Sequence, residues 1–402
     1  MHRNSDDRLG RSRYKSPMGI DNRSRENQSD FCLIGSQPEH RLSQFERLTL
    51  VGGRELDRAL LLVGRQVAQF TAGSDLAPFR ESDVGEAIRF YRERRSQGVN
   101  PFPNPRSAPL FEENSVHGLA DGEVVDLHFE STFKTTNPAM TDFFAESVAN
   151  RTVYARWWRH ATPTAGTVVA VHGWTMGDQR LNSLAFLPGL FYRLGLDVVL
   201  VELPFHGRRR STREGVVFPS TDLALTNEAL AQAIADLRSI RSIVEKRSSS
   251  ALGAIGMSLG AYVASLWAGL DKLAFCIPVV PLVSMSDLAW RLVGENPHLG
   301  AEAAGVTKEV LQEVFAHHCP LSYPPQTAGE CAFIIASRDD SVVPAIQPER
   351  LGAHWEGARL VWVDGGHEAL FQRSQAFNRA IEFLSALGLI KHTNFADLHP
   401  VA

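Results

Sequence analysis

The sequence predicts an α/β protein with a mostly parallel central sheet covered by helices on both faces. Two kinds of segment support this prediction. Short runs such as Thr167–His172 and Asp197–Glu202 are apolar along nearly their whole length, which is typical of strands buried on both sides. Segments with helical periodicity alternate with these runs, and strands that alternate with helices along a chain favour parallel pairing through crossover helices.

Length and composition limit the class of protein. The chain has 402 residues and a net charge of −4, so it can bury a large core and has no general attraction for nucleic acid. No apolar run reaches the roughly 20 residues that span a bilayer, and the polar start of the chain lacks the apolar core of a signal peptide. The four cysteines are too scattered for a disulfide framework. We expect a cytoplasmic protein without stable membrane insertion; the oligomeric state stays open.

The first part of the chain is expected to lie outside the main domain. Residues 1–45 are polar and charged, which predicts a disordered tail. Apolar residues at three- and four-residue intervals predict a helix over 53–70, and Ser82–Arg95 a second one. The proline-rich Asn100–Pro105 forbids a helix. We therefore expect a helical extension and linker over 53–105. Its apolar faces could pack on the main domain or between two copies.

The main domain is expected to span residues 120–390. Apolar or partly alternating runs predict its strands: Glu123–Phe133, Val153–Arg159, Thr167–His172, Asp197–Glu202, Leu273–Val283, Ala332–Ala336 and Arg359–Val363, with a short one before Ser258. Helical spacing of apolar residues predicts helices over Leu181–Leu194, Thr226–Lys246 and Ser374–Leu387, and one after Ser258. A loop is expected between Asn137 and Asn150. Residues 284–330 interrupt the alternation, and their helical spacing predicts a small inserted lid.

The stretch Gly256-Met-Ser-Leu-Gly260 lies between a predicted strand and a predicted helix. A serine at such a sharp turn projects its hydroxyl above the sheet, and the flanking glycines let strand and helix pass close together. The backbone N–H of Leu259, at the first turn of the helix, can stabilise an oxyanion that forms beside Ser258. Ser258 is therefore the candidate nucleophile.

A serine nucleophile needs a base, and the base needs an acid to orient it. Asp340 follows one predicted strand in Asp340-Ser-Val-Val-Pro344, and His367 follows another in Gly-Gly-His367. Carboxyl ends of parallel strands meet at one edge of a sheet, so these groups are candidates for acid and base. Asp339 is the alternative acid, because it adjoins Asp340.

Two other clusters are candidates for binding. Arg208 and Arg209 lie just after a predicted strand, where guanidinium groups could bind a carboxylate or phosphate of a substrate, although a solvated loop is the commoner use of such residues. His317-His318-Cys319 contains metal-ligand types, but no further ligands stand at usable spacing, so we expect no metal.

Five pieces occur in one order: His172-Gly-Trp174, Leu203-Pro-Phe-His-Gly207, Gly256–Gly260, Asp340–Pro344 and Gly-Gly-His367. On these pieces the chain from Val153 to Leu387 resembles an α/β-hydrolase of the serine esterase, lipase and peptidase superfamily, with the subgroup open. The resemblance implies Ser258 as nucleophile, His367 as base and Asp340 as orienting acid. It also implies that the backbone N–H groups of Trp174 and Leu259 form the oxyanion hole, that His172 shapes the oxyanion turn, and that no cofactor is needed.

These residues predict a serine hydrolase that cleaves an ester, thioester or amide of a small-molecule acyl substrate. Two alternatives stay open. An acyltransferase would use the same three side chains with an acceptor other than water. A non-catalytic binding module of the same fold would retain them without turnover.

Overall fold

The computed structural model describes residues 81–105, 108–211, 218–220, 222–248, 250–294, 306–367 and 373–390. All of them belong to one compact unit, Leu48–Ala402. The predicted polar tail over 1–45 and the predicted helix over 53–70 lie outside the described residues.

One sheet organises the described part of the chain, with nine strands in the order β1-β2-β3-β5-β4-β6-β7-β8-β9. The strands are β1 (Phe111–Leu119), β2 (Gly122–Glu130), β3 (Thr152–His160), β4 (Gly166–Val171), β5 (Leu196–Val201), β6 (Ala251–Met257), β7 (Cys276–Val279), β8 (Phe333–Ser337) and β9 (Arg359–Val363). The pairs from β1 through β3 to β5 are antiparallel, and all pairs from β5 to β9 are parallel. The carboxyl ends of the parallel strands therefore share one edge.

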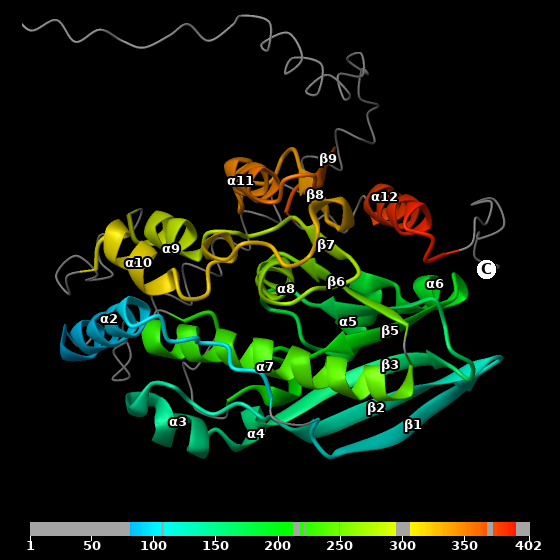
Figure 1. Ribbon diagram of the computed structural model, residues 1–402, viewed down its shortest axis with the longest axis horizontal. Helices are drawn as coiled ribbons and strands as arrows, with labels where there is room; N and C mark the ends of the chain where they lie inside the picture. Colours follow the sequence, from blue (N-terminus) through cyan, green and yellow to red (C-terminus); the bar gives the residue numbers. More distant parts are fainter. Residues whose placement is uncertain are drawn as a thin grey trace, which may run out of the picture. The chain divides into compact units, whose positions relative to one another are not determined.

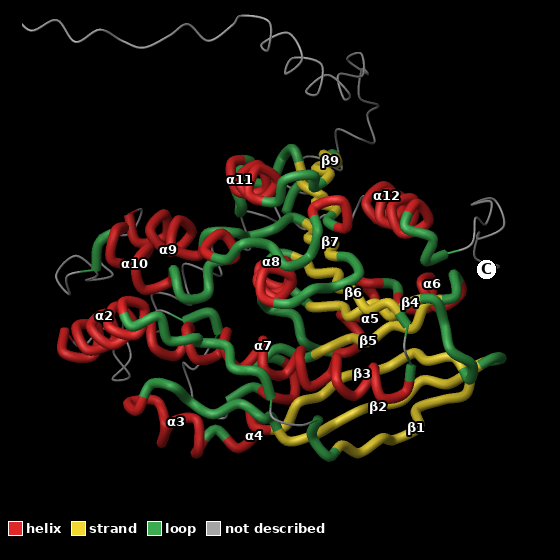
Figure 2. Tube along the Cα trace, viewed as in Figure 1, coloured by secondary structure: helices red, strands yellow, loops and turns green. Residues whose placement is uncertain are grey.

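Helices cover both faces of this sheet (Figures 1 and 2). One face packs against α7 (Leu223–Arg247), α8 (Leu259–Leu270) and α11 (Ile346–His354). The other face packs against α5 (Gln179–Phe186), α6 (Pro188–Arg193) and α12 (Arg373–Ala386). Successive side chains of a strand point to opposite layers: in β4, Val169 and Val171 face the first layer, and Val168 and Ala170 face the second. Apolar runs without polar alternation are the sequence signature of such a sheet.

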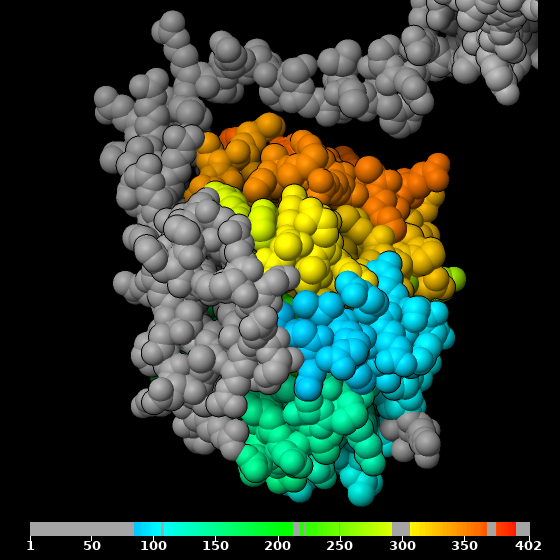
Figure 3. All heavy atoms as spheres, turned by 90° about the vertical axis from the view of Figure 1, so that its left-hand side faces the viewer, coloured from blue at the N-terminus to red at the C-terminus, as the bar shows by residue number. Residues whose placement is uncertain are grey.

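The segment between β7 and β8 carries α9 (Met285–Gly294) and α10 (Lys308–Phe315). Residues 284–330 are the insertion for which the sequence predicts a lid, and we call them the 284–330 segment. Helix α2 (Glu81–Ser96) lies alongside α10 (Figures 1 and 3). The Arg92 guanidinium donates two hydrogen bonds to the Glu313 carboxylate, at 2.6 and 2.7 Å. Tyr91 is buried, and its hydroxyl donates to Glu228 on α7 at 3.2 Å. The apolar face of α2 thus packs within this chain.

Several elements differ from the sequence prediction. The helix expected over Leu181–Leu194 is two helices, because Leu187 adopts φ 47° and Pro188 begins a new turn. The strand expected over Leu273–Val283 is limited to β7. The loop expected between Asn137 and Asn150 contains α3 (Thr141–Glu146) and α4 (Val148–Arg151).

The sequence did not predict β1 or α11. Strand β1 is an edge strand with almost every residue exposed, so it carries no apolar alternation. Helix α11 is only nine residues long and contains Pro348 in its first turn. Its buried side chains are few, and short helices of this kind have weak periodic signals.

Candidate active site

Ser258 occupies a sharp turn between β6 and α8, with φ 52° and ψ −112°. Positive φ is unfavourable for a residue with a side chain, and here the surrounding packing enforces it. A Cβ on Gly260 would overlap the carbonyl of Val171 on β4, and a Cβ on Gly256 would overlap the backbone of Gly260. Both glycines are therefore required by the close passage of helix and strands, as predicted.

Three side chains from distant parts of the chain meet at this turn. The His367 Nε2 atom lies 2.7 Å from the Ser258 Oγ atom, and the His367 Nδ1 atom lies 2.7 Å from Asp340 Oδ2. The side chains of His367 and Asp340 are only 4% and 5% exposed. An ionised carboxylate can only accept hydrogen bonds, so Nδ1 carries the proton and Nε2 is left to accept from the serine hydroxyl.

The topology explains why they meet. Asp340 follows β8, His367 follows β9, and Ser258 follows β6, so all three leave the same edge of the parallel sheet. The Asp340 Oδ1 atom accepts hydrogen bonds from the amides of Val342 and Val343, at 2.9 and 2.7 Å. The turn thereby fixes the direction of the carboxylate. The carboxylate of Asp340 thus lies against His367.

The turn after β4 lies beside Ser258. A Cβ placed on Gly173 would be 3.6 Å from the Cβ of Ser258. His172 is fully buried, its Nδ1 donates to the Gly173 carbonyl at 2.8 Å, and its Nε2 accepts from the Leu203 amide at 3.0 Å. Burial lowers the pKa of His172 to about 3, so the ring stays neutral and links the Gly173 carbonyl to the Leu203 amide.

The two amides named for the oxyanion hole belong to segments that border Ser258. Trp174 follows Gly173 directly, and its side chain is half-buried. Leu259 is the first residue of α8, and the N–H groups in the first turn of a helix have no intrahelical acceptor. Such an N–H is available to a developing negative charge, which the positive end of the helix dipole also favours.

Arg209, which the sequence offered as a possible substrate-binding group or as part of a solvated loop, lies in the interior of the protein. Its guanidinium is fully buried and donates to the Asp236 carboxylate at 2.8 Å and to the carbonyls of Asn150 and Glu202 at 2.9 and 3.0 Å. Sequence reasoning missed Asn150 and Asp236. The available signal was an acid, Asp236, between Ala235 and Leu237 in a predicted helix, since a carboxylate that is buried requires a partner.

Arg208 is also engaged by the protein. Its side chain is about 41% exposed, its Nη2 lies 2.8 Å from Glu202 Oε1, and the guanidinium carbon lies 4.1 Å from the centre of the Tyr154 ring. An ion pair with a buried carboxylate and stacking on an aromatic ring hold the cation in place. These contacts engage the guanidinium that the sequence offered only as a possible substrate-binding group.

The His317-His318-Cys319 cluster has partners within the fold. The His318 Nδ1 atom lies 2.6 Å from the Tyr262 hydroxyl, and the His317 Nε2 atom donates to the Tyr91 carbonyl. Across the described residues, no group of three or more His, Cys, Asp or Glu side chains is arranged to hold a metal ion. Nor do the helices described here include one with the length and apolarity needed to cross a membrane.

The sequence is similar to those of two mycobacterial proteins. It is 34% identical over 301 residues to "Uncharacterized protein Rv2627c" of Mycobacterium tuberculosis, an alignment that covers 72% of this chain and 71% of that protein. It is also 34% identical over 229 residues to "Uncharacterized protein MT2702" of a second strain, covering 56% of this chain and 54% of that protein. No family model matches the sequence.

Among solved structures, acetyl xylan esterase 1 from Thermoanaerobacterium sp. superposes with a TM-score of 0.50 and 16% sequence identity. The superposition covers 77% of this chain and 96% of that one. At this level of identity the likeness establishes a shared fold. That fold has a large, mostly parallel sheet with helices on both faces, as the sequence predicted.

Proposed function

We propose that this chain, which belongs to the family of the mycobacterial protein Rv2627c, is a serine hydrolase of the α/β-hydrolase superfamily. The proposed enzyme cleaves an ester, thioester or amide through an acyl-enzyme. One observation carries the proposal: a single imidazole, that of His367, lies 2.7 Å from both the Ser258 hydroxyl and the Asp340 carboxylate.

In the proposed reaction Ser258 attacks the substrate carbonyl while Nε2 of His367 takes the hydroxyl proton. Asp340 holds the ring in the tautomer with its proton on Nδ1 and stabilises the imidazolium that forms. The amide hydrogen bonds from Val342 and Val343 keep this carboxylate oriented. The strained backbone of Ser258 supports the same role, because it holds the hydroxyl clear of β6 and α8.

The tetrahedral intermediate carries its negative charge toward the amides of Trp174 and Leu259. Loss of one such donor raises a barrier by about 2.7–4 kcal/mol, so the proposed rate depends on the placement of these two amides as well as on the side chains. The protonated His367 then gives its proton to the leaving group and the acyl-enzyme forms. Water activated by His367 releases the acyl group. Every step uses groups of this chain, without a cofactor.

We propose a carboxylic ester of a small molecule as the substrate. Support comes from the fold shared with acetyl xylan esterase 1, an enzyme named for the cleavage of an acetyl ester. The cytoplasmic location predicted from the sequence is part of the same proposal.

A panel of p-nitrophenyl esters with acyl chains of increasing length tests the activity, with Ser258→Ala as the matched control. We expect hydrolysis by the natural chain and covalent labelling of Ser258 by a fluorophosphonate probe, both lost in Ser258→Ala. Product analysis with added alcohols separates hydrolysis from acyl transfer. A folded protein that neither labels nor turns over any ester would instead be a binding module.

A further inference from the structure

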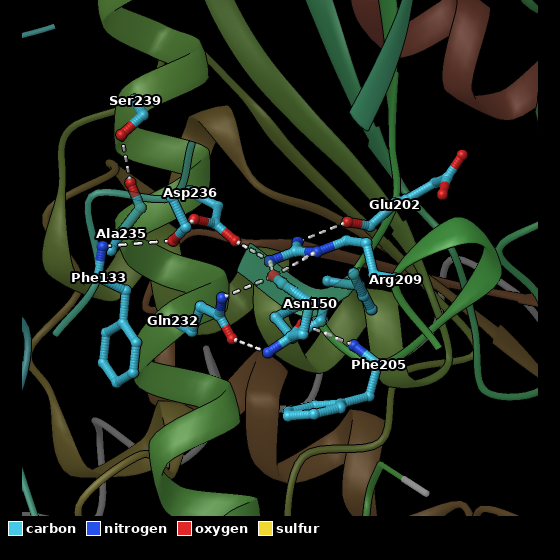
Figure 4. A network of polar contacts seen from close by, with 12 residues as sticks. Phe133, Asn150, Glu202, Phe205, Arg209, Gln232, Ala235, Asp236 and Ser239 are labelled. Atoms are coloured by element: carbon cyan, nitrogen blue, oxygen red, sulfur yellow. Dashed lines mark hydrogen bonds and ion pairs between the residues drawn. The ribbon is translucent and has the colours of Figure 1, made fainter. Parts of the chain in front are cut away.

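The guanidinium of Arg209 joins three separate parts of the fold (Figure 4). It binds the carboxylate of Asp236 on α7, the carbonyl of Asn150 on α4, and the carbonyl of Glu202 just after β5. Both charged side chains are buried, at 0% and 2% exposure. A planar guanidinium can bind several acceptors at fixed angles, which an ammonium cannot do.

Burial of this ion pair has little advantage for stability. Removing two charges from water is costly, and apolar side chains of the same volume often stabilise a fold equally well or better. The distinctive effect of the pair is geometric: it holds the backbone carbonyls of Asn150 and Glu202 in fixed positions relative to α7.

Asn150 extends the network to the turn of residues 203–207, which we call the 203–207 turn. Its Oδ1 atom accepts from the Phe205 amide at 3.1 Å, and its Nδ2 donates to Gln232 Oε1 at 2.7 Å. Phe205 adopts φ 58°, a left-handed conformation that is rare for an aromatic residue. The hydrogen bond that Phe205 donates to Asn150 therefore stabilises the turn in this conformation.

The 203–207 turn also contacts the loop of residues 172–177, which contains the Trp174 amide. The Leu203 amide donates to His172 Nε2 at 3.0 Å. The two segments also touch directly, since a Cβ on Gly177 would lie only 2.7 Å from the Gly207 nitrogen and 2.9 Å from the His206 Cβ. The 172–177 loop thus contacts the 203–207 turn at two separate places, through one hydrogen bond and one close backbone approach.

We propose that the Arg209–Asp236 ion pair positions the oxyanion turn: it fixes the carbonyls that shape the 203–207 turn, and this turn holds the 172–177 loop beside Ser258. Arg209 is accordingly a positioning residue, which acts through other groups. The catalytic consequence rests on the proposed serine hydrolase function, whereas the effect on the two loops does not.

Two variants test the proposal. Arg209→Lys keeps a cation for Asp236 but loses the planar fork. The double variant Arg209→Met with Asp236→Leu removes both charges and fills the space with apolar groups, so it is designed to fold. The matched controls are Arg238→Lys and the double variant Arg238→Met with Asp271→Leu. Arg238 lies on α7, as Asp236 does. It pairs with Asp271 at 2.7 and 2.9 Å and donates to the Phe102 carbonyl, away from both loops.

The first readout is hydrogen exchange at the amides of Leu203, Phe205 and Gly177, each hydrogen-bonded in the intact protein. We expect exchange at these amides to rise by about 10-fold or more in the Arg209 variants and to stay unchanged in the Arg238 controls. Equal exchange in the Arg209 and Arg238 variants would overturn the proposal, whether or not the protein hydrolyses an ester.

The second readout is steady-state kinetics on an ester that the natural chain hydrolyses. Small misplacement of an oxyanion donor lowers turnover more than binding, so we expect kcat to fall about 10- to 100-fold in the Arg209 variants with KM within about 3-fold. An equal fall in the Arg238 controls would contradict positioning. Absence of any hydrolysis or labelling by the natural chain would refute the proposed function. Hydrogen exchange at the three amides would then be the test of whether Arg209 positions the two loops.

Discussion

Asp340 accepts the hydrogen bond of the His367 imidazole at 2.7 Å, while its second carboxylate oxygen is bound by the amides of its own turn. The carboxylate therefore has one orientation, and it imposes one tautomer on His367. An amide in its place would retain the size of the side chain but present an N–H toward Nδ1.

Asp340→Asn should lower kcat about 10³- to 10⁴-fold, because the wrong tautomer of His367 cannot accept the proton of Ser258. KM should change little, since the substrate does not contact Asp340 in the proposed mechanism. Ester hydrolysis measured under saturating substrate checks the prediction.

The control for this variant is Asp339→Asn, which alters the neighbouring acid. It should retain kcat within about 3-fold, because Asp340 is the acid hydrogen-bonded to His367. Similar losses in the two variants would mean that the acid has been assigned wrongly.

Gly260→Ala should destabilise the protein by about 3 kcal/mol or more, because the new methyl group would overlap the backbone of Val171, which cannot move aside. The free energy of unfolding from urea titration checks this. Gly85→Ala is the matched control, with nothing within 4 Å of the added carbon in α2. Helix propensity predicts that it stabilises α2 by up to about 1 kcal/mol. A Gly260→Ala protein as stable as the natural one would contradict the close packing at the elbow.

Gln347 on α11 binds the start of the 284–330 segment. Its buried Oε1 atom accepts hydrogen bonds from the amides of Val283 and Ser284, at 2.7 and 2.9 Å. Gln347→Ala would leave two buried amides without an acceptor, so we expect a loss of about 1–3 kcal/mol in the free energy of unfolding. The exposed Gln326→Ala should change it by less than about 0.5 kcal/mol. Comparable losses for the two variants would rule out a special role for Gln347.

Buried neutral histidines should make the fold sensitive to mild acid. Burial lowers the pKa of His172 and His318 to about 3 and that of His206 to about 4. In the unfolded chain each titrates near its ordinary value of about 6.5. Between pH 6.5 and 4 the unfolded state thus binds more protons, so stability falls as the pH is lowered through this window.

Each such histidine contributes a slope of at most about 1.4 kcal/mol per pH unit. Urea unfolding at pH 7, 6 and 5 measures the combined slope. His318→Asn should reduce it, because that protein lacks one of the three buried imidazoles. A slope that is identical in the two proteins would show that His318 is not protonated on unfolding in this range.

Much of the fold could be predicted from local patterns. Strands such as β4 and β5 are buried on both faces, so their apolar runs are visible without knowledge of their neighbours. Edge strand β1 buries little and carries no such pattern. The break at Leu187 depends on one residue in a left-handed conformation, which the helical periodicity around it conceals.

The candidate site divides in the same way. Ser258, Asp340 and His367 each follow a strand, so their placement at one sheet edge could be inferred from their order in the chain. The burial of Arg209 could not be inferred in this way. Its charge and its position after β5 suggested a side chain that is exposed to solvent or binds a substrate, but its partners lie on α4 and α7.

The sequence by itself determined the alternation of strands and helices, the glycines at the serine turn and the types of residue available for catalysis, because these depend on side chains a few positions apart. Only the tertiary structure decided which acid lies against His367 and which arginine is buried. Hydrogen bonding and burial depend on atoms that are far apart along the chain, and folding alone brings those atoms together.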